Sequence, residues 1–197
     1  MPRAAEGLDV VIARLDAPAH EACLSHAERQ RARRFRFERD RRRFVAGRAR
    51  LRELLGARLG VQPAAVELAY GSNGKPRLAR GGWHFSVSHC DEVALFAFSA
   101  GSEIGVDIEA IRAVQEADAI AAQCFSRREY AAYSSLESRD KPLGFLECWT
   151  RKEAFVKALG EGLSMPLDRF DVSLAPGWQV HSFSPLPGFI AALACHG

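Results

Sequence analysis

The stretch Ile104-Gly-Val-Asp-Ile-Glu109 decides how we interpret this chain, because it places acidic side chains inside an apolar pattern. Its apolar residues alternate with Gly105, Asp107 and Glu109, which is the period of two that a half-buried strand shows. The two carboxylates therefore share one face of the strand, about 7 Å apart from the rise per residue. We interpret the glycine on the same face as room for a ligand.

A second stretch, Trp149-Thr-Arg-Lys-Glu-Ala-Phe-Val-Lys157, follows a helical period instead. One stripe of this helix, at positions i, i+4, i+8 and i+11, holds Phe145, Trp149, Glu153 and Val156. A carboxylate on such an apolar stripe needs a cation. Because no paired cysteines or histidines accompany the acidic residues, a hard ion such as Mg²⁺ suits them best. The predicted metal ligands are Asp107, Glu109 and Glu153.

Each acidic residue also has an ordinary explanation. Asp107 and Glu109 could form the solvent face of an edge strand, and Glu153 with Lys157 could be a surface pair worth a few tenths of a kcal/mol. Taken together these explanations fit less well, since like charges on one face repel and an aromatic stripe argues against full exposure.

The two stretches, in this order and about 40 residues apart, resemble the signature of 4′-phosphopantetheinyl transferases of the Sfp type. That signature is (V/I)G(V/I)D(I/V)E followed by WxxKEAxxK, and every fixed position of its second part is matched. Gly74-Lys75-Pro76 and Trp83-His-Phe-Ser-Val-Ser-His89 resemble further family segments. Cys90 departs from the pattern, because a serine is usual there. The resemblance covers the chain from about Arg29 to about Phe170.

The resemblance implies an α+β fold of two similar α/β halves related by a pseudo-twofold, with a cofactor cleft between them. We expect the boundary near Ser99 to Gly101, so that residues 1–100 form the N-terminal half and residues 101–197 the C-terminal half. The implied activity transfers the 4′-phosphopantetheine arm of coenzyme A to a serine of an apo carrier protein and releases adenosine 3′,5′-bisphosphate.

The resemblance also implies roles for individual residues. Asp107, Glu153 and Lys157 form the catalytic set: Glu153 takes the serine proton, directly or through a bound water, and Lys157 faces the charge that develops on the phosphate. Arg43 and His89 match contacts to the 3′-phosphate, although His89 could also be a histidine bonded in a turn. The expected cofactor-binding set is Arg43, Lys75, Pro76, Ser88, His89, Asp107, Lys152 and Lys157. For Lys152 a surface ion pair is the alternative.

The charge of the chain is unevenly distributed. The net charge is +3, but residues 29 to 52 hold twelve arginines against Glu38 and Asp40, which leaves 3 − 10, or −7, for the rest. Clustered arginine suggests a nucleic-acid-binding module. Apolar residues interleaved at helical spacing favour instead a folded helix with arginine on its exposed side. Coenzyme A and an acidic acyl, peptidyl or aryl carrier would both use that surface.

The 197 residues, 48% of them hydrophobic, are enough for one compact domain or two small halves. No apolar run reaches the length of a membrane span and no signal-peptide pattern begins the chain, so we expect a cytoplasmic protein with neither membrane nor nucleic acid as partner. Two halves in one chain favour a monomer. The five cysteines form no metal-ligand spacing, so we expect free, mostly buried thiols. A catalytically silent coenzyme A binding protein remains an alternative.

The periodicity also predicts individual elements. Strands are expected at 8–15, 66–70, 84–88, 93–99, 104–109, 170–174, 178–185 and 188–195. Helices are expected at 18–35, 40–59, 114–123, from 126 onward and at 143–159.

Overall fold

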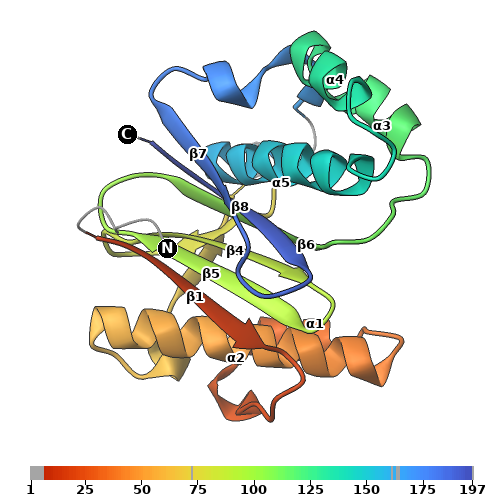
Figure 1. The fold of residues 1–197 in the computed structure, drawn as a ribbon. Coiled ribbons are helices and arrows are strands. Elements are labelled where there is room, and N and C mark those ends of the chain that lie inside the picture. Colours follow the sequence, from red (N-terminus) through yellow and green to blue (C-terminus); the bar gives the residue numbers. More distant parts are fainter. Residues whose placement is uncertain (1–6, 72, 161, 163–164, 197) are drawn as a thin grey trace.

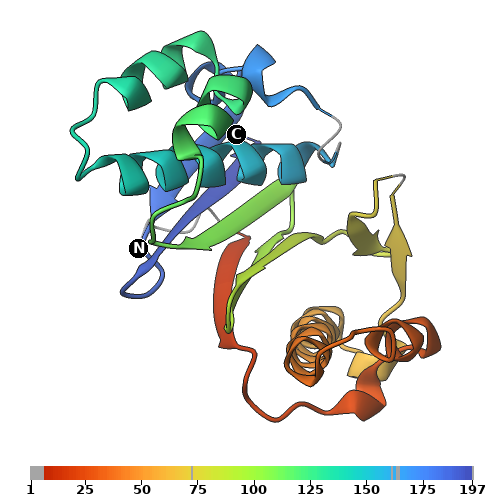
Figure 2. The same cartoon turned by 90° about the vertical axis from the view of Figure 1, so that its right-hand side faces the viewer.

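The computed structural model describes residues 7–71, 73–160, 162 and 165–196. Two three-stranded sheets lie face to face, with one long helix on each outer side (Figure 1). The helix α2 (Glu38–Leu59) covers one sheet and α5 (Lys141–Leu159) covers the other, as the turned view also shows (Figure 2). The expected α+β fold is confirmed.

The two sheets have the same topology. The first is made of β1 (Leu8–Arg14), β4 (His84–Cys90) and β5 (Val93–Ser99), in the order β1-β5-β4. The second is made of β6 (Ile104–Ala110), β7 (Trp178–Phe183) and β8 (Phe189–His196), in the order β6-β8-β7. Each sheet therefore begins with a strand, continues through its long helix and closes with an antiparallel hairpin. This repeat gives the two similar halves that the family resemblance implied.

The central strands are buried on both faces, and each face serves a different layer. In β5, Phe96 and Phe98 pack toward α2, while Val93 and Leu95 pack in the cluster that holds the apolar residues of β6. All seven β5 residues are buried. Side chains of β8 alternate in the same way: Leu193 packs in the central cluster, whereas Ala192 and Ala194 pack against α5. The contact between the halves is therefore part of the hydrophobic core.

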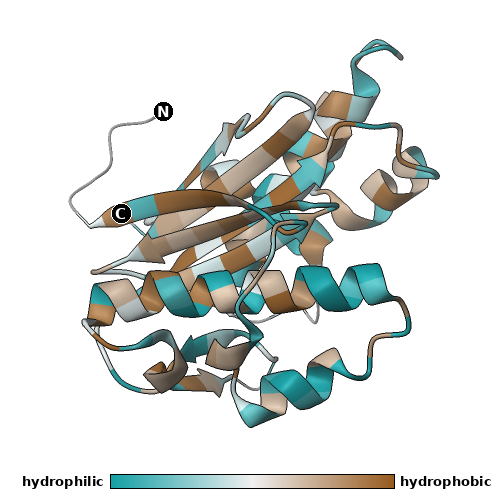
Figure 3. Cartoon of the chain, turned by 90° about the horizontal axis from the view of Figure 1, so that it is seen from below, coloured by the Kyte–Doolittle hydropathy of each residue, from teal (hydrophilic) through white to brown (hydrophobic). Residues whose placement is uncertain are grey.

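Local sequence signals explain where the helices begin and end. The helices α1 (His26–Ala32) and α4 (Arg127–Ser134) each start with a capping box, in which a serine and a glutamate bond each other's backbone. The long helices α2 and α5 end at Gly60 and Gly160, both in the left-handed conformation that favours glycine. Hydrophilic residues predominate along α1 and α2, whereas the strands behind them are largely hydrophobic (Figure 3).

The remaining elements are short. They are the strands β2 (Leu68–Tyr70) and β3 (Pro76–Leu78), the helix α3 (Ala117–Cys124), and single 3₁₀ turns at Glu21–Cys23, Pro63–Ala65, Leu167–Arg169 and Val172–Leu174. Among the described residues, no helix has both the length and the apolar character that a membrane span requires.

Four expectations from the sequence are wrong. The five cysteines are free as expected, but only Cys90 is buried and the other four are partly exposed. The first helix starts at His26 rather than near residue 18, because Ser25 caps it. The predicted strand at 170–174 is a 3₁₀ turn, whose Val172 N–H donates to Glu129 on α4 instead of to a neighbouring strand. Arg52 is not on the exposed side of α2: it is buried and bonds Glu28 at 2.7 Å and two backbone carbonyls.

Candidate functional site

The strand β6 and the helix α5 contact each other closely at Gly105. A Cβ atom at this position would overlap the carbonyl oxygen of Ala154 and approach Ala158 N to 2.5 Å. The glycine therefore makes room for the backbone of α5, and the expectation that it makes room for a ligand is wrong. This close approach brings the carboxylates of β6 next to the side chains of α5.

Three polar side chains meet at this contact. Lys157 on α5 donates from Nζ to Oδ1 of Asp107 at 2.6 Å and to Oγ of Ser88 at 2.9 Å. Ser88, on β4 of the other half, donates to the same Asp107 oxygen at 2.7 Å. Asp107 is 4% exposed. The two halves thus share one buried, charged hydrogen-bond network.

Two more carboxylates lie beside this network. Burial raises the pKa of Glu153, and the negative charges of Asp107 and Glu109 raise it further, against the effect of Lys157. Burial likewise raises the pKa of Glu109, with a contribution from Asp107. The acidic cluster is therefore short of positive charge, and a cation would stabilise it.

The acidic cluster fits a metal ion that the substrate completes. Within the described ranges, no group of three or more Asp, Glu, His or Cys side chains has a geometry that could hold an ion alone. However, Oδ2 of Asp107 and Oε1 of Glu153 are buried without a hydrogen-bond partner. Mg²⁺ usually binds through one or two carboxylates together with waters and substrate phosphates. These unpaired oxygens suit such a site.

Arg43 and His89 belong to the N-terminal half, and His89 lies close enough to Lys157 for the charges to act on one another. Arg43 bonds Asp16 through Nε at 2.8 Å and Nη2 at 3.2 Å, with Glu92 at 3.8 Å. Partial burial lowers the pKa of His89, and the positive charges of Lys157 and Arg43 act in the same direction. An anion bound between these side chains would be attracted by both cations and would favour a protonated imidazole.

Lys75 and Pro76 reach a cleft between the two halves from the N-terminal side. Together with Lys157 they line a cavity of about 240 Å³ between the strands of one half and the end of α5. Lys75 donates to Glu103 at 3.0 Å and to the Ala158 carbonyl at 3.1 Å, so its ammonium spans the two halves. The cavity extends the network at Asp107 along the boundary.

Lys152 does not reach the cleft, although we expected it to bind the cofactor or to pair at the surface. Its side chain is fully buried on another face of α5 and donates to Glu129 at 2.5 Å and to the Phe170 carbonyl at 2.8 Å. Because it has no exposed surface, it is not available to a ligand. Its neighbour Glu153 faces the cleft, since successive helix residues point about 100° apart.

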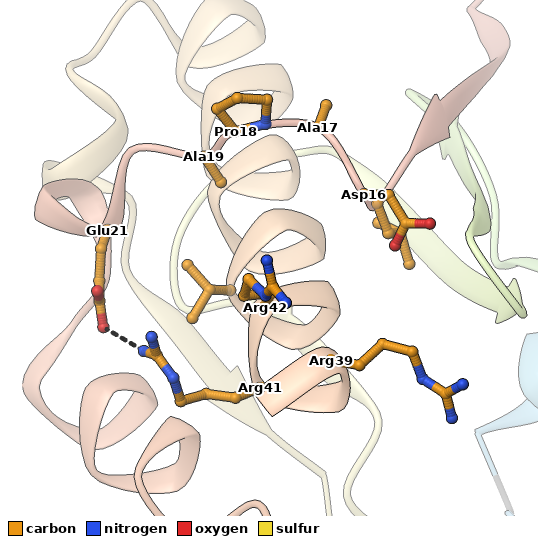
Figure 4. Close-up of a pocket in the computed structure, with 10 residues that line it drawn as sticks. Asp16, Ala17, Pro18, Ala19, Glu21, Arg39, Arg41 and Arg42 are labelled. Carbon is orange, nitrogen blue, oxygen red and sulfur yellow. Dashed lines mark ion pairs between the residues drawn. The ribbon is translucent and has the colours of Figure 1, made fainter. Parts of the chain in front are cut away.

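The sequence did not predict two features near the site. One is the wider role of Glu129, which besides capping α4 at Ser126 N accepts from Lys152 and Val172 N and thereby ties α4 and the 3₁₀ turn at Val172 to α5. The other is a cavity of about 560 Å³ between the loop after β1 and the first turns of α2. Its lining includes Asp16 and Glu21 and, as Figure 4 shows, Arg39, Arg41 and Arg42. Only the density of arginine in this segment could have indicated it.

Comparison with known proteins gives consistent results for both halves. The family model described as 4′-phosphopantetheinyl transferase superfamily matches residues 103–188, and one described as 4′-phosphopantetheinyl transferase, N-terminal, matches residues 16–101. The 4′-phosphopantetheinyl transferase HetI of Nostoc sp. is 38% identical over 190 residues, covering 89% of this chain and 80% of HetI. The 4′-phosphopantetheinyl transferase Sfp of Bacillus subtilis is 30% identical, covering 80% of this chain and 69% of Sfp. The L-aminoadipate-semialdehyde dehydrogenase-phosphopantetheinyl transferase of Xenopus laevis is 28% identical, covering 78% of this chain and 55% of its own.

Proposed function

The chain belongs to the 4′-phosphopantetheinyl transferase superfamily, and from that premise we propose that it transfers the 4′-phosphopantetheine arm of coenzyme A to a serine of an apo carrier protein. The observation that carries this proposal is the network of Lys157, Asp107 and Ser88, which joins the two halves beside the unpaired oxygen of Glu153. Positioning and charge neutralisation supply most of the catalysis in phosphoryl-type transfer, and this cleft offers both.

The proposed reaction forms one bond and breaks one bond at the phosphorus of the pantetheine phosphate. The serine oxygen of the carrier attacks this phosphorus while the bond to the leaving adenosine 3′,5′-bisphosphate breaks. Glu153 takes the serine proton, a task that its raised pKa favours. Lys157 stays close to Asp107 in the resting network and turns its charge toward the phosphate oxygens as negative charge develops there.

We include Mg²⁺ in this proposal. When bound, it would neutralise the pyrophosphate oxygens of coenzyme A. Asp107, Glu109 and Glu153 would hold it, with the substrate phosphates completing its ligands. Burial and neighbouring negative charges raise the pKa values of Glu109 and Glu153, and a bound cation would counteract both effects.

The cofactor would lie along the boundary between the halves. Lys75 and Pro76 line the cavity next to Lys157 and would contact the adenine end. Arg43 and His89 would hold the 3′-phosphate. To do so, Arg43 would release Asp16 and bind the phosphate instead. A phosphate dianion offers a guanidinium group stronger hydrogen bonds than an exposed carboxylate does.

The carrier protein would dock near the arginine-rich surface. Arg36 is exposed, and the side chain of Arg39 is 71% exposed and pairs with the adjacent Asp40 at 3.4 Å. Such weakly paired guanidinium groups attract an acidic partner over a distance of about one Debye length. We therefore propose an acidic apo carrier as the second substrate.

One experiment tests the activity directly. The protein is incubated with coenzyme A, Mg²⁺ and a panel of apo acyl, peptidyl and aryl carriers, and the carriers are then weighed by mass spectrometry. We expect at least one carrier to gain the mass of one phosphopantetheine arm, and a variant of that carrier without the serine to gain none. Coenzyme A binding by calorimetry without any mass gain would instead indicate a catalytically silent binding protein.

A further inference from the structure

Side chains of β4 pair with the open edge of β6. β6 is the outer strand of its sheet, so one of its edges has no strand partner in that sheet. Three alternate β4 residues fill this place: Ser86 Oγ accepts from Val106 N at 3.1 Å, Ser88 bonds Asp107, and Cys90 Sγ accepts from Ala110 N at 3.3 Å. We call this row of Ser86, Ser88 and Cys90 the seam.

Cys90 makes a second contact that the serines of the seam do not make. Its thiol lies 3.4 Å from Oε2 of Glu109, within the range for a hydrogen bond to sulfur. The residue is buried, with 7% of its surface exposed. A protonated thiol donates to the carboxylate while its sulfur accepts from the Ala110 N–H. The position suits hydrogen bonding and disfavours a nucleophilic thiolate.

We propose that Cys90 is a positioning residue that fixes the carboxylate of Glu109 for cation binding, by engaging Oε2 and leaving Oε1 to the cation. This inference rests on the proposed function, because it needs a cation at the acidic cluster. Partners of this kind orient a metal ligand, and their loss typically lowers metal affinity about 10- to 100-fold.

The geometry also makes the sulfur specific. A C–O bond is shorter than a C–S bond, so a serine hydroxyl on the same backbone stops short of both Glu109 and Ala110 N. The family pattern has serine here, yet in this chain Cys90→Ser should lose much of the effect, as Cys90→Ala does. The matched control is Cys148→Ala, which removes another thiol, one that lies on α5 and packs, partly buried, against a separate apolar cluster.

The first measurement is direct titration of the full chain with Mn²⁺, with and without coenzyme A. The electron paramagnetic resonance signal of the free ion reports how much Mn²⁺ is bound. We expect Cys90→Ala to bind Mn²⁺ about 10-fold more weakly and Cys148→Ala to match the wild type. Mn²⁺ affinity unchanged in Cys90→Ala but lost in Asp107→Ala would overturn the inference and leave the metal site standing. If wild type and Asp107→Ala both fail to bind Mn²⁺, the metal part of the proposed function fails together with the inference.

A second measurement needs no metal and does not depend on a stable Cys90→Ala variant. The S–H stretching band of Cys90 can be followed by difference infrared spectroscopy in metal-free protein. Glu109→Gln weakens the acceptor and should shift this band, whereas Glu147→Gln on the exposed side of α5 should not. A band that stays in place in Glu109→Gln would show that the thiol does not donate to Glu109.

Discussion

Lys157 and Asp107 form an ion pair, with Nζ and Oδ1 2.6 Å apart, at the point where α5 crosses β6. Ser88 of the other half bonds both groups, so the pair belongs to both halves of the molecule. The side chain of Lys157 is 31% exposed and that of Asp107 only 6%, so solvent reaches the pair from the lysine side. An incoming phosphate would therefore meet the ammonium group first.

Removing Asp107 should abolish transfer without unfolding the protein. We expect Asp107→Ala to lose about 10²- to 10³-fold in turnover, because a preorganised charge is lost from the site. Carrier mass spectrometry measures the rate, and circular dichroism checks the fold. Glu147→Ala, an exposed carboxylate on α5, should react at the wild-type rate. A chelator should stop the wild-type reaction, and a rate that withstands the chelator would contradict the proposed metal dependence.

A substitution at Glu153 tests whether this residue acts as the base or binds the cofactor. Glu153→Gln keeps the size of the side chain but cannot accept the serine proton, so turnover should fall about 10²- to 10⁴-fold. Coenzyme A affinity should change much less, since the lost interaction exists mainly in the transition state. Single-turnover kinetics and calorimetry give the two values. A loss confined to affinity, with an unchanged single-turnover rate, would reassign Glu153 to cofactor binding.

Arg43 should distinguish coenzyme A from its 3′-dephospho analogue. Arg43→Ala is expected to weaken coenzyme A binding roughly 10- to 100-fold, the range for one charged hydrogen-bonding group, and to leave the analogue nearly unaffected. Asp16→Asn is the matched control: it frees Arg43 from its resting partner and should not weaken coenzyme A. Equal penalties for both ligands in Arg43→Ala would show that this arginine does not meet the 3′-phosphate.

The exposed arginines should act on the carrier instead. Reversing the charge in Arg36→Glu is expected to slow association with an acidic carrier at low salt, and the difference should shrink as salt screens the surface. Stopped-flow association at several salt concentrations measures this effect. Arg139→Glu makes the same charge change on an arginine that is 79% exposed in the other half, and serves as control. Identical carrier kinetics for the two variants would argue against steering by the arginine-rich surface.

Lys152 should affect stability more than binding. Lys152→Met leaves Glu129 buried without its cation and should destabilise the fold by about 3 to 5 kcal/mol. The double variant Lys152→Met, Glu129→Gln removes both charges and should regain part of that loss in denaturant unfolding. A Lys152→Met variant that is as stable as wild type but binds coenzyme A weakly would restore the cofactor contact that the sequence suggested.

Much of the fold followed from local signals. Period-two alternation located β6, and glycines marked the ends of α2 and α5. The failures came from partners far along the chain. Nothing near Lys152 in the sequence shows that it pairs with Glu129 on α4. Likewise, nothing near Arg52 shows that it pairs with Glu28 on α1. A charged residue in a helical pattern has the same sequence signal whether it is solvated or buried in a pair.

The candidate site shows the same limit. The spacing within β6 and within α5 fixes which face each carboxylate occupies, and the carboxylates of the two elements lie close enough for their charges to act on one another. Gly105 was misinterpreted, because a close approach of ligand and a close approach of backbone both require an absent Cβ. Only the packing of α5 against β6 distinguishes the two.

The seam between β4 and β6 has a consequence for the integrity of the chain. Its side chains occupy backbone donors on an edge that would otherwise be free to pair with a strand of another molecule. If the C-terminal half were separated from the N-terminal half, this edge of β6 and the apolar face of the same strand would both be exposed to water. The separated half should aggregate, so each half depends on contact with the other to keep this edge covered.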